Sequence, residues 1–281
     1  MPYGTWIIRE IESPKGYVLS EEEIAVTIGK VDEVVEIELV NYFIKGNIAL
    51  TKVDEDYPDN KLSGAVFEVY SDTNGDGKLD KDDTLLGEMK ELDGGVYQMS
   101  ELRYGKYLVK ETKAPTGFVL DEDVYAVSIE ENGKTYTVEN KAGVGFINAA
   151  QKGSLKIVKT SSDGKVEGFS FRVTGVDYDQ TFKTDKNGEI VIEGLRIGDY
   201  TVSEVSDKAS AGYILPADKQ ATVKVNATAI VQMHNEFRDT PKTGDDFNLG
   251  LWVSLAALSV VGAGVLGFVG YKNRKKKRRT N

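Results

Sequence analysis

The sequence predicts an all-β protein, made of β-sandwich repeats in tandem and followed by one C-terminal transmembrane helix. Three observations support this class. Short runs of alternating apolar and polar residues, broken by Gly, Asn and Asp, fill the chain before residue 249 without a long helical period. Related strings recur along that part of the chain. One uncharged stretch, residues 249–271, stands directly before a strongly basic end.

Composition excludes several classes of function. The 281 residues include no cysteine and one histidine, which excludes disulfides, thiolate zinc sites, a cysteine nucleophile and a multi-histidine metal centre. The net charge is −10 although residues 272–279 are strongly basic. The rest of the chain is therefore acidic enough to repel phosphates, and we expect no nucleic-acid partner. The sequence contains no Gly-rich phosphate loop and no Ser–His–Asp set, so we do not expect an enzyme.

Self-similar strings divide the chain into repeats. YGKYLVKETKAPTGF at residues 104–118 resembles YGTWIIREIESPKGY at 3–17 and IGDYTVSEVSDKASAGY at 197–213. GNIALTKVD from residue 46 and GSLKIVKTS from residue 153 mark two repeat starts. The expected units are the C-terminal part of a truncated repeat at 1–45, whole repeats at 46–152 and 153–238, and a distinct C-terminal segment at 239–281. A chain that starts within a repeat is expected to be a fragment of a longer protein.

Each repeat is predicted to consist of short strands that form a β-sandwich. In the runs 65–70 and 169–174, alternation turns Phe67, Val69, Phe171 and Val173 toward a core. An Asn-Gly pair at 187–188 lies between two strand-like runs and predicts a hairpin. Linkers such as residues 149–152 are short, which favours a stacked rod over flexibly joined domains.

The C-terminal segment predicts a membrane anchor. At about 1.5 Å per residue, the uncharged span 249–271 makes roughly 34 Å of helix, enough to cross the hydrocarbon core. A buried core helix is disfavoured because the span has no polar face. The basic tail at 272–281 indicates that this end stays in the cytoplasm, so residues before 249 lie outside the cell.

A short motif precedes the predicted span. Its residues are Thr240, Pro241, Lys242, Thr243 and Gly244. This motif is followed by an acidic pair, the apolar span and the basic end, and that order resembles the sortase sorting signal of Gram-positive bacteria. Thr240 stands where the signal usually has Leu.

The resemblance implies that a sortase cysteine attacks the Thr243 carbonyl and breaks the Thr243–Gly244 bond. The acyl group then passes to an amine of a peptidoglycan precursor or to a pilin lysine. The membrane helix would be a temporary anchor, and the mature protein would lie in the cell wall at the cell surface.

The repeat strings, YLVKETKAPTGF above all, resemble the Cna B-type, or SpaA-type, repeats of Gram-positive surface proteins and pilins. The resemblance implies a transthyretin-like, reversed immunoglobulin (prealbumin-like) sandwich. It also implies an intramolecular isopeptide bond between a Lys on the first strand and an Asn on the last, promoted by a buried acid. The matching residues are Lys52, Glu111 and Asn148 in the middle repeat, Lys159, Glu204 and Asn235 in the third, and Glu10 and Asn41, without a lysine strand, in the first.

This chemistry requires those residue types. Burial lowers the pKa of a lysine and so makes it a nucleophile, while a carboxyl kept protonated can polarise the Asn carboxamide. Two alternatives stay open in the middle repeat, namely Asn140 as the acceptor, or an ordinary Lys–Glu ion pair beside a hydrogen-bonded Asn. In the third repeat, the loop after Glu204 is two residues longer and lacks a counterpart of Pro115.

An acidic insertion in the middle repeat fits the EF-hand loop template and predicts weak calcium binding that stiffens the loop. The ligand positions are Asp72, Asn74, Asp76, the Lys78 carbonyl, Asp80 and Asp83. Asp83 replaces the usual bidentate Glu, and the flanking segments resemble strands. The alternative is a solvated acidic loop without a metal.

Together these features predict a sortase-attached surface protein. The leading hypothesis is a rigid structural stalk or accessory pilus subunit, and the alternative is an adhesin whose repeats bind a host or matrix ligand. Tyr57-Pro58-Asp59-Asn60-Lys61 faintly resembles the pilin motif that supplies a polymerising lysine, but Asp59 occupies the lysine position. We therefore do not expect polymerisation through that motif.

Overall fold

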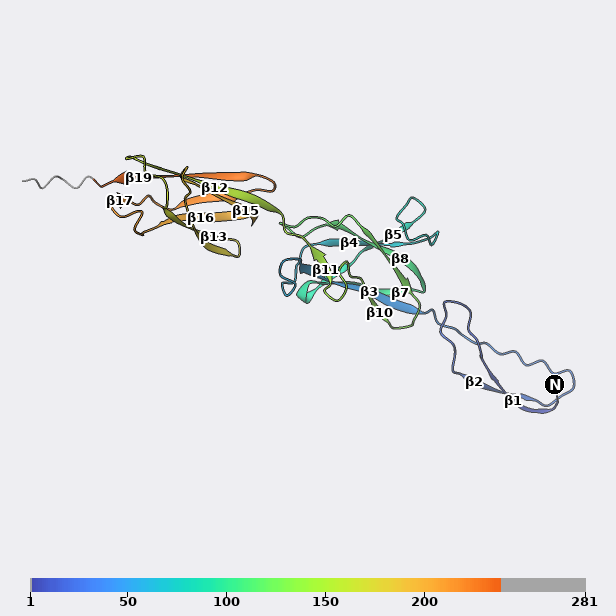
Figure 1. The fold of residues 1–281 in the computed structure, drawn as a ribbon. Helices are drawn as coiled ribbons and strands as arrows, with labels where there is room; N and C mark the ends of the chain where they lie inside the picture. The colour runs from blue at the N-terminus through green and yellow to red at the C-terminus, as the bar shows by residue number, and fades with distance from the viewer. Residues whose placement is uncertain (1, 239–281) are drawn as a thin grey trace, which may run out of the picture.

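The computed structural model describes residues 2–238, which form three all-β units joined end to end in an extended rod (Figure 1). The predicted sorting motif, membrane span and basic tail lie outside the described residues. Within residues 2–238, none of the helices has the length and apolar character needed to cross a bilayer.

The middle repeat is a sandwich of two sheets. One sheet has the order β10-β3-β7-β6, with β11 also paired to β3, and the other has the order β5-β4-β8-β9. A single 3-10 turn, η1 (Asp93–Gly95), precedes β7. The strands are β3 (Lys45–Asp54), β4 (Val66–Ser71), β5 (Thr84–Glu88), β6 (Lys90–Leu92), β7 (Val96–Arg103), β8 (Gly105–Lys113), β9 (Val124–Ile129), β10 (Thr135–Thr137) and β11 (Phe146–Asn148).

The third repeat has the same architecture with a continuous last strand. Its sheets have the orders β15-β12-β19-β17 and β14-β13-β16-β18. The strands are β12 (Lys152–Ser161), β13 (Ser170–Gly175), β14 (Tyr178–Lys183), β15 (Glu189–Arg196), β16 (Gly198–Val205), β17 (Tyr213–Ile214), β18 (Lys219–Val223) and β19 (Thr228–Phe237).

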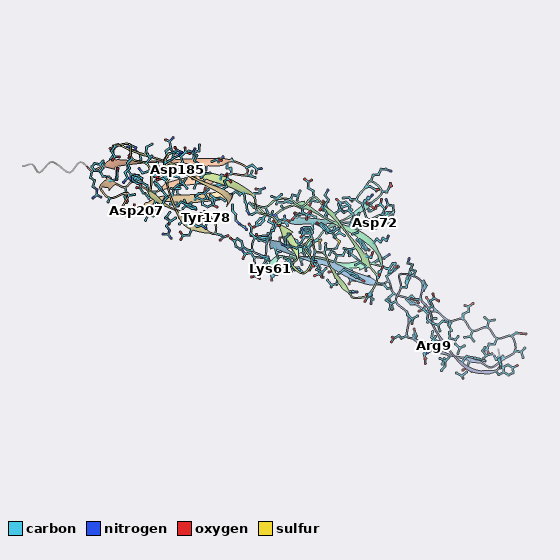
Figure 2. The ribbon with its side chains drawn as sticks, in the orientation of Figure 1. Arg9, Lys61, Asp72, Tyr178, Asp185 and Asp207 are labelled. Carbon is cyan, nitrogen blue, oxygen red and sulfur yellow. The ribbon has the colours of Figure 1, made fainter. Side chains whose placement is uncertain are left out.

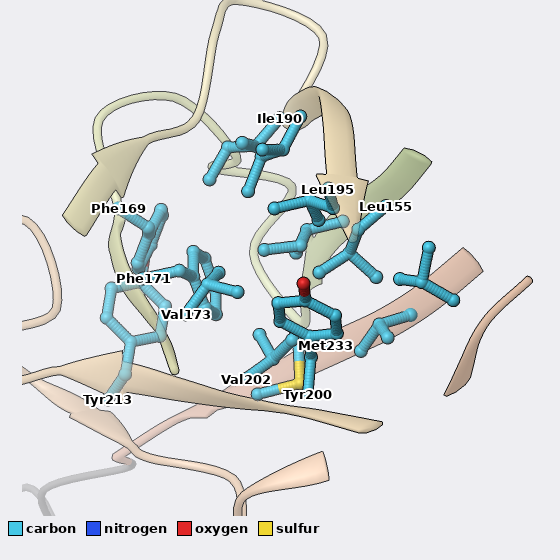
Figure 3. Packing of buried hydrophobic residues seen from close by; sticks show 14 residues of the cluster. Leu155, Phe169, Phe171, Val173, Ile190, Leu195, Tyr200, Val202, Tyr213 and Met233 are labelled. Carbon is cyan, nitrogen blue, oxygen red and sulfur yellow. The ribbon is translucent and has the colours of Figure 1, made fainter. Parts of the chain in front are cut away.

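Both sandwiches close over cores supplied by alternate residues of facing strands. Phe67 and Val69 on β4, and Phe171 and Val173 on β13, are fully buried, which confirms the predicted alternation. Figure 3 shows Phe171 and Val173 packed beside Tyr200 and other core residues of the third repeat.

The predicted hairpin at Asn187–Gly188 is wrong. The local turn does form, because Gly188 adopts φ +78° and donates its N–H to the Asp185 carbonyl at 3.0 Å. However, the strands before and after it, β14 and β15, belong to different sheets. The turn residues determine the local backbone, but Ile190 and Ile192 on β15 are buried against the opposite layer, and this burial selects the sheet.

The first unit is a single two-stranded sheet of β1 (Gly4–Arg9) and β2 (Glu23–Ile28). Within residues 2–45 the sheet has no facing sheet, and apolar side chains such as Ile7 and Val34 remain exposed. Residues 10–44 contribute only an isolated bridge between Tyr17 and Phe43 outside the two strands. The unit thus contains the counterparts of β8 and β9 without the rest of the sandwich.

Each junction between units is short and uses an equivalent arginine. Arg103 ends β7 and stacks on Phe43 of the first unit, with 4.0 Å from its guanidinium carbon to the ring centroid. Arg196 ends β15 and bonds bidentately to Asp54 of the middle repeat, at 2.7 and 2.8 Å. Asp54 is 2% exposed and the Arg196 side chain 14%, so this pair is largely shielded from solvent. The second junction is therefore fixed by a buried ion pair.

Candidate functional site

Three strands of the middle repeat bring together the predicted lysine, acid and asparagine. Lys52 lies on β3, Glu111 on β8 and Asn148 on β11, and all three are buried, with exposures of 0%, 0% and 3%. The Asn148 carboxamide donates from Nδ2 to both Glu111 oxygens, at 3.0 Å to Oε1 and 2.9 Å to Oε2. Lys52 Nζ donates to the Phe146 carbonyl at 2.9 Å.

Strand register explains why these side chains converge. Lys52 follows the inward alternation of Ile48 and Leu50 along β3, so its side chain enters the core. Strand β11 runs parallel to β3 with Phe146 opposite Lys52, which puts Asn148 two residues further along on the same face. Glu111 lies opposite the core residue Phe67 across the β4–β8 pair.

The electrostatic environment favours neutral forms of both ionisable groups. Burial lowers the pKa of Lys52 from its ordinary 10.5 to about 8, against the attraction of Glu111. Burial also raises the pKa of Glu111. Asn148 Oδ1 has no hydrogen-bond partner among the described residues. Burial thus shifts both groups toward the neutral amine and the protonated acid that amide transfer requires, beside an unpartnered carboxamide oxygen.

The third repeat repeats this arrangement at the same register. Lys159 on β12 lies opposite Met233 of the parallel strand β19, and Asn235 again stands two residues further along. Asn235 Nδ2 donates to Glu204 Oε1 at 2.7 Å, and Lys159 Nζ donates to the Thr160 carbonyl at 2.5 Å. Lys159, Glu204 and Asn235 are buried, and burial lowers the pKa of Lys159 and raises that of Glu204.

The first unit contains only the acid and the amide. Asn41 Nδ2 donates to Glu10 Oε1 at 2.7 Å, and the Ser20 backbone N–H donates to Glu10 Oε2 at 2.8 Å. No lysine of residues 2–45 bonds to either side chain. The first unit therefore contains the acid and the asparagine of the predicted site without the lysine.

Asn140, the alternative acceptor, is fully engaged elsewhere. Its Nδ2 donates to Asp121 Oδ2 at 2.7 Å and to the Ile147 carbonyl at 2.9 Å, and its Oδ1 accepts the Ile147 N–H at 2.6 Å. Asp121 belongs to no motif that marks it in the sequence, but its backbone N–H donates to Glu111 Oε2 at 2.9 Å. The ten-residue spacing from the acid, shared by Glu10 and Ser20, is the signal that could have found it.

The acidic loop lies between β4 and β5, with Asp72 at its base (Figure 2). Its side chains bond largely to the backbone of the loop itself. Asp72 accepts the N–H groups of Gly75 and Gly77, at 2.7 and 3.1 Å, and Asp83 accepts those of Thr73 and Asp80. Within residues 2–238, no three acidic or histidine side chains lie close enough to hold a metal ion. The oxygen donors have the chemistry that calcium prefers, and calcium binding stays a prediction.

Comparison with solved structures finds several chains that are similar to this one. The Bacillus anthracis TIE protein has 27% identity and a TM-score of 0.64, and the match covers 85% of this chain and 42% of that one. This chain thus spans less than half the length of that protein. A streptococcal ancillary pilin matches at 19% identity and TM-score 0.31, covering 85% of this chain and 76% of that one.

A third similar structure is GBS52, the minor pilin of Streptococcus agalactiae, at 17% identity and TM-score 0.31, covering 71% of this chain and 98% of that one. No curated protein sequence matches the chain. The family described as SpaA, prealbumin-like fold domain, matches residues 1–42, 46–142 and 153–237, which together are most of the chain. The chain therefore belongs to the SpaA prealbumin-like fold family.

Proposed function

We propose that the protein is a structural stalk of the Gram-positive cell surface, either a wall-anchored surface protein or an accessory pilus subunit. Isopeptide bonds between Lys52 and Asn148 and between Lys159 and Asn235 lock its repeats. The observation that carries this proposal is the burial of a lysine, a carboxyl and an asparagine together, twice, at one strand register. Family membership and the extended arrangement of the units support it as well.

The bond forms by one intramolecular amide exchange. Neutral Lys52 Nζ attacks Asn148 Cγ, an Nζ–Cγ bond forms, and the Cγ–Nδ2 bond breaks. Glu111 gives its proton to the departing nitrogen and accepts the proton that Nζ loses, so ammonia leaves and the acid ends as it began. Holding the groups in one buried site supplies the proximity effect, worth about 7–11 kcal/mol of barrier in favourable cases. The reaction occurs once per repeat and needs no cofactor.

The position of the bond suits a stalk under tension. The last strand β11 leads through Gln151 directly into β12 of the next repeat. A force pulling on that linker reaches Asn148 within a few residues. A covalent link to Lys52 passes the force to the first strand β3 and protects the sheet hydrogen bonds from separating. A chain without cysteine thereby obtains the kind of cross-link that other extracellular domains obtain from disulfides.

Attachment by a sortase rests on the sequence of the segment that follows the third repeat. Cleavage between Thr243 and Gly244 would leave Thr243 joined to a peptidoglycan or pilin amine, only a few residues after β19. The stalk would then begin almost at the attachment point. We also propose that calcium, held by oxygens of residues 72–83, stiffens the loop between β4 and β5.

The intact mass of the full chain tests the proposed bonds. Two closed repeats predict a mass lower than that of the sequence by two ammonia molecules. Lys52→Ala and Lys159→Ala should each restore one ammonia mass, and the double variant both. A wild-type mass equal to that of the sequence would refute the locked stalk. Retention of residues 244–281 in protein isolated from cells with an active sortase would refute the attachment.

A further inference from the structure

The hydrogen bonds of Glu111 distinguish its two carboxyl oxygens. Both oxygens accept Asn148 Nδ2, but Oε2 also accepts the backbone N–H of Asp121 at 2.9 Å, whereas Oε1 has no second donor among the described residues. A backbone N–H is a donor and never an acceptor. When the carboxyl is protonated, the oxygen that faces this N–H is therefore the carbonyl oxygen, and the proton resides on Oε1.

A proton on Oε1 needs an acceptor on the Asn148 side. The torsion at the end of an Asn side chain is broad and nearly two-fold, so a half-turn exchanges the places of Nδ2 and Oδ1. Asn148 Oδ1, which has no hydrogen-bond partner among residues 2–238, then accepts a hydrogen bond from this O–H, before the proton moves to the departing nitrogen. The Asp121 N–H thus selects the oxygen from which Glu111 polarises the carboxamide.

The Asp121 backbone is held by its own side chain. Asp121 Oδ2 accepts the Tyr125 hydroxyl at 2.8 Å and Asn140 Nδ2 at 2.7 Å, and Oδ1 accepts the Asp123 N–H at 2.9 Å. The Tyr125 ring packs edge-on against Phe146, the residue whose carbonyl accepts Lys52 Nζ. The segment that orients the acid is therefore in contact with the strand that orients the amine.

Asn140 connects the same segment to the acceptor. It binds Asp121 with Nδ2, and it binds both backbone groups of Ile147, the neighbour of Asn148. One side chain thus fixes the acid loop and strand β11 relative to each other.

We propose that Asp121, Asn140 and Tyr125 are positioning residues for closure of the middle repeat: they hold the Asp121 N–H on Glu111 Oε2, so that Glu111 presents its proton from Oε1 to Asn148. This inference rests on the proposed Lys52–Asn148 bond. The first unit contains the corresponding bond at the same ten-residue spacing, from the Ser20 N–H to Glu10 Oε2 at 2.8 Å. The third repeat lacks the bond within the described residues, since Glu204 Oε2 has no partner there.

The test follows bond closure in the full chain after cell-free synthesis. Samples are quenched over time, digested, and analysed for branched and linear peptides of each repeat by mass spectrometry. The Lys159–Asn235 bond of the same molecule is the internal reference for synthesis and folding. The variants are Asn140→Ala and Tyr125→Phe, and the matched control is Asn132→Ala, which removes a side-chain acceptor of the Lys45 N–H in the same repeat.

We expect Asn140→Ala to slow closure of the middle repeat by on the order of 10- to 100-fold relative to the third repeat. Tyr125→Phe keeps the ring packed on Phe146 and removes only the hydroxyl, whose hydrogen bond goes to Asp121 and not to β11. It should therefore slow closure by a smaller factor, and solely through Asp121. Asn132→Ala should close at the wild-type rate. In chains that also carry Asn148→Ala and cannot close, Tyr125→Phe and Asn132→Ala should shift the melting temperature alike.

Wild-type closure rates in both Asn140→Ala and Tyr125→Phe would overturn the inference. Slowing by Asn140→Ala alone would overturn it too, because Asn140 would then act only through strand β11. If the closure rate in all three variants falls in proportion to their loss of melting temperature, the substitutions act through folding in general. That result would also contradict the inference. A wild-type chain without branched peptides in either repeat would instead refute the proposed function.

Discussion

The middle and third repeats hold the same three functional groups at the same register but connect them differently to their surroundings. Glu111 accepts bonds from Asn148 and from the Asp121 backbone, whereas Glu204 accepts only from Asn235 among the described residues. The strands that carry the groups correspond, but the loop after Glu204 is two residues longer. Strand pairing thus brings the lysine, the acid and the asparagine together in both repeats, and the loop after the acid determines which further hydrogen bonds the acid accepts.

The largest effect should come from the acid itself. Glu111→Gln keeps the shape and the hydrogen-bonding oxygen but has no proton to transfer, so we expect closure of the middle repeat to slow by about 10²–10⁴-fold. Glu204→Gln should do the same in the third repeat, and each variant should leave the other repeat closed. Peptide mapping of each full chain measures this. Loss of both bonds from a single substitution would show that the repeats do not close independently.

The buried ion pair between the repeats should matter next. Arg196→Ala leaves Asp54 buried without its partner, which should cost about 3–5 kcal/mol in the stability of the middle repeat. The matched control is Arg172→Ala, which removes an exposed ion pair with Asp179 and should leave stability nearly unchanged. Chemical unfolding in chains that carry both Asn148→Ala and Asn235→Ala, where no bond masks a loss in either repeat, measures both. Equal effects of the two substitutions would contradict a fixed junction.

In chains that cannot form the bonds, the two buried lysines should make stability depend on pH. In Asn148→Ala, the unfolded chain holds a proton on Lys52 between pH 8 and 10.5 that the folded chain has released, because burial lowers the folded pKa to about 8. Stability should therefore rise as pH increases through that window. Asn235→Ala should show the same direction through Lys159, whose pKa burial also lowers. In the closed wild-type chain both amines are part of amide bonds, so thermal melts should show no such rise of stability with pH. The same slope of stability against pH in the wild-type and variant chains would contradict this prediction.

Calcium should give the smallest effect, and only in the middle repeat. With Kd on the order of 10⁻⁴–10⁻³ M, calcium at tenfold excess over Kd stabilises by about 1.4 kcal/mol. Asp76→Ala, within the loop between β4 and β5, should abolish this shift, and Asp59→Ala, in an exposed turn of the same repeat, should keep it. A melting temperature that calcium leaves unchanged would refute calcium binding.

Much of this architecture could be predicted because it depends on local periodicity. Alternation along β4 and β13 identified buried Phe67 and Phe171, and the repeated strings indicated tandem sandwiches. The same alternation brings Lys52 and Lys159 into the cores, since each continues an inward-facing row. The resemblance to SpaA-type repeats then paired these lysines with Asn148 and Asn235.

Other features depend on contacts that sequence spacing does not encode. The Asn187–Gly188 turn is local, but the choice of sheet for β15 depends on burial of Ile190 against the other layer. Asn140 resembled an acceptor in sequence, and only its bonds to Asp121 and Ile147 reveal a positioning role. The ion pair of Arg196 could not be predicted, because its partner Asp54 lies 142 residues earlier in the sequence.

Mapping of branched peptides from the mature wild-type chain tests the locked-stalk account most directly. The account predicts two branched peptides, one joining Lys52 to Asn148 and the other joining Lys159 to Asn235, with Asn140 recovered in a linear peptide. Recovery of all four residues in linear, unmodified peptides from folded protein would contradict it.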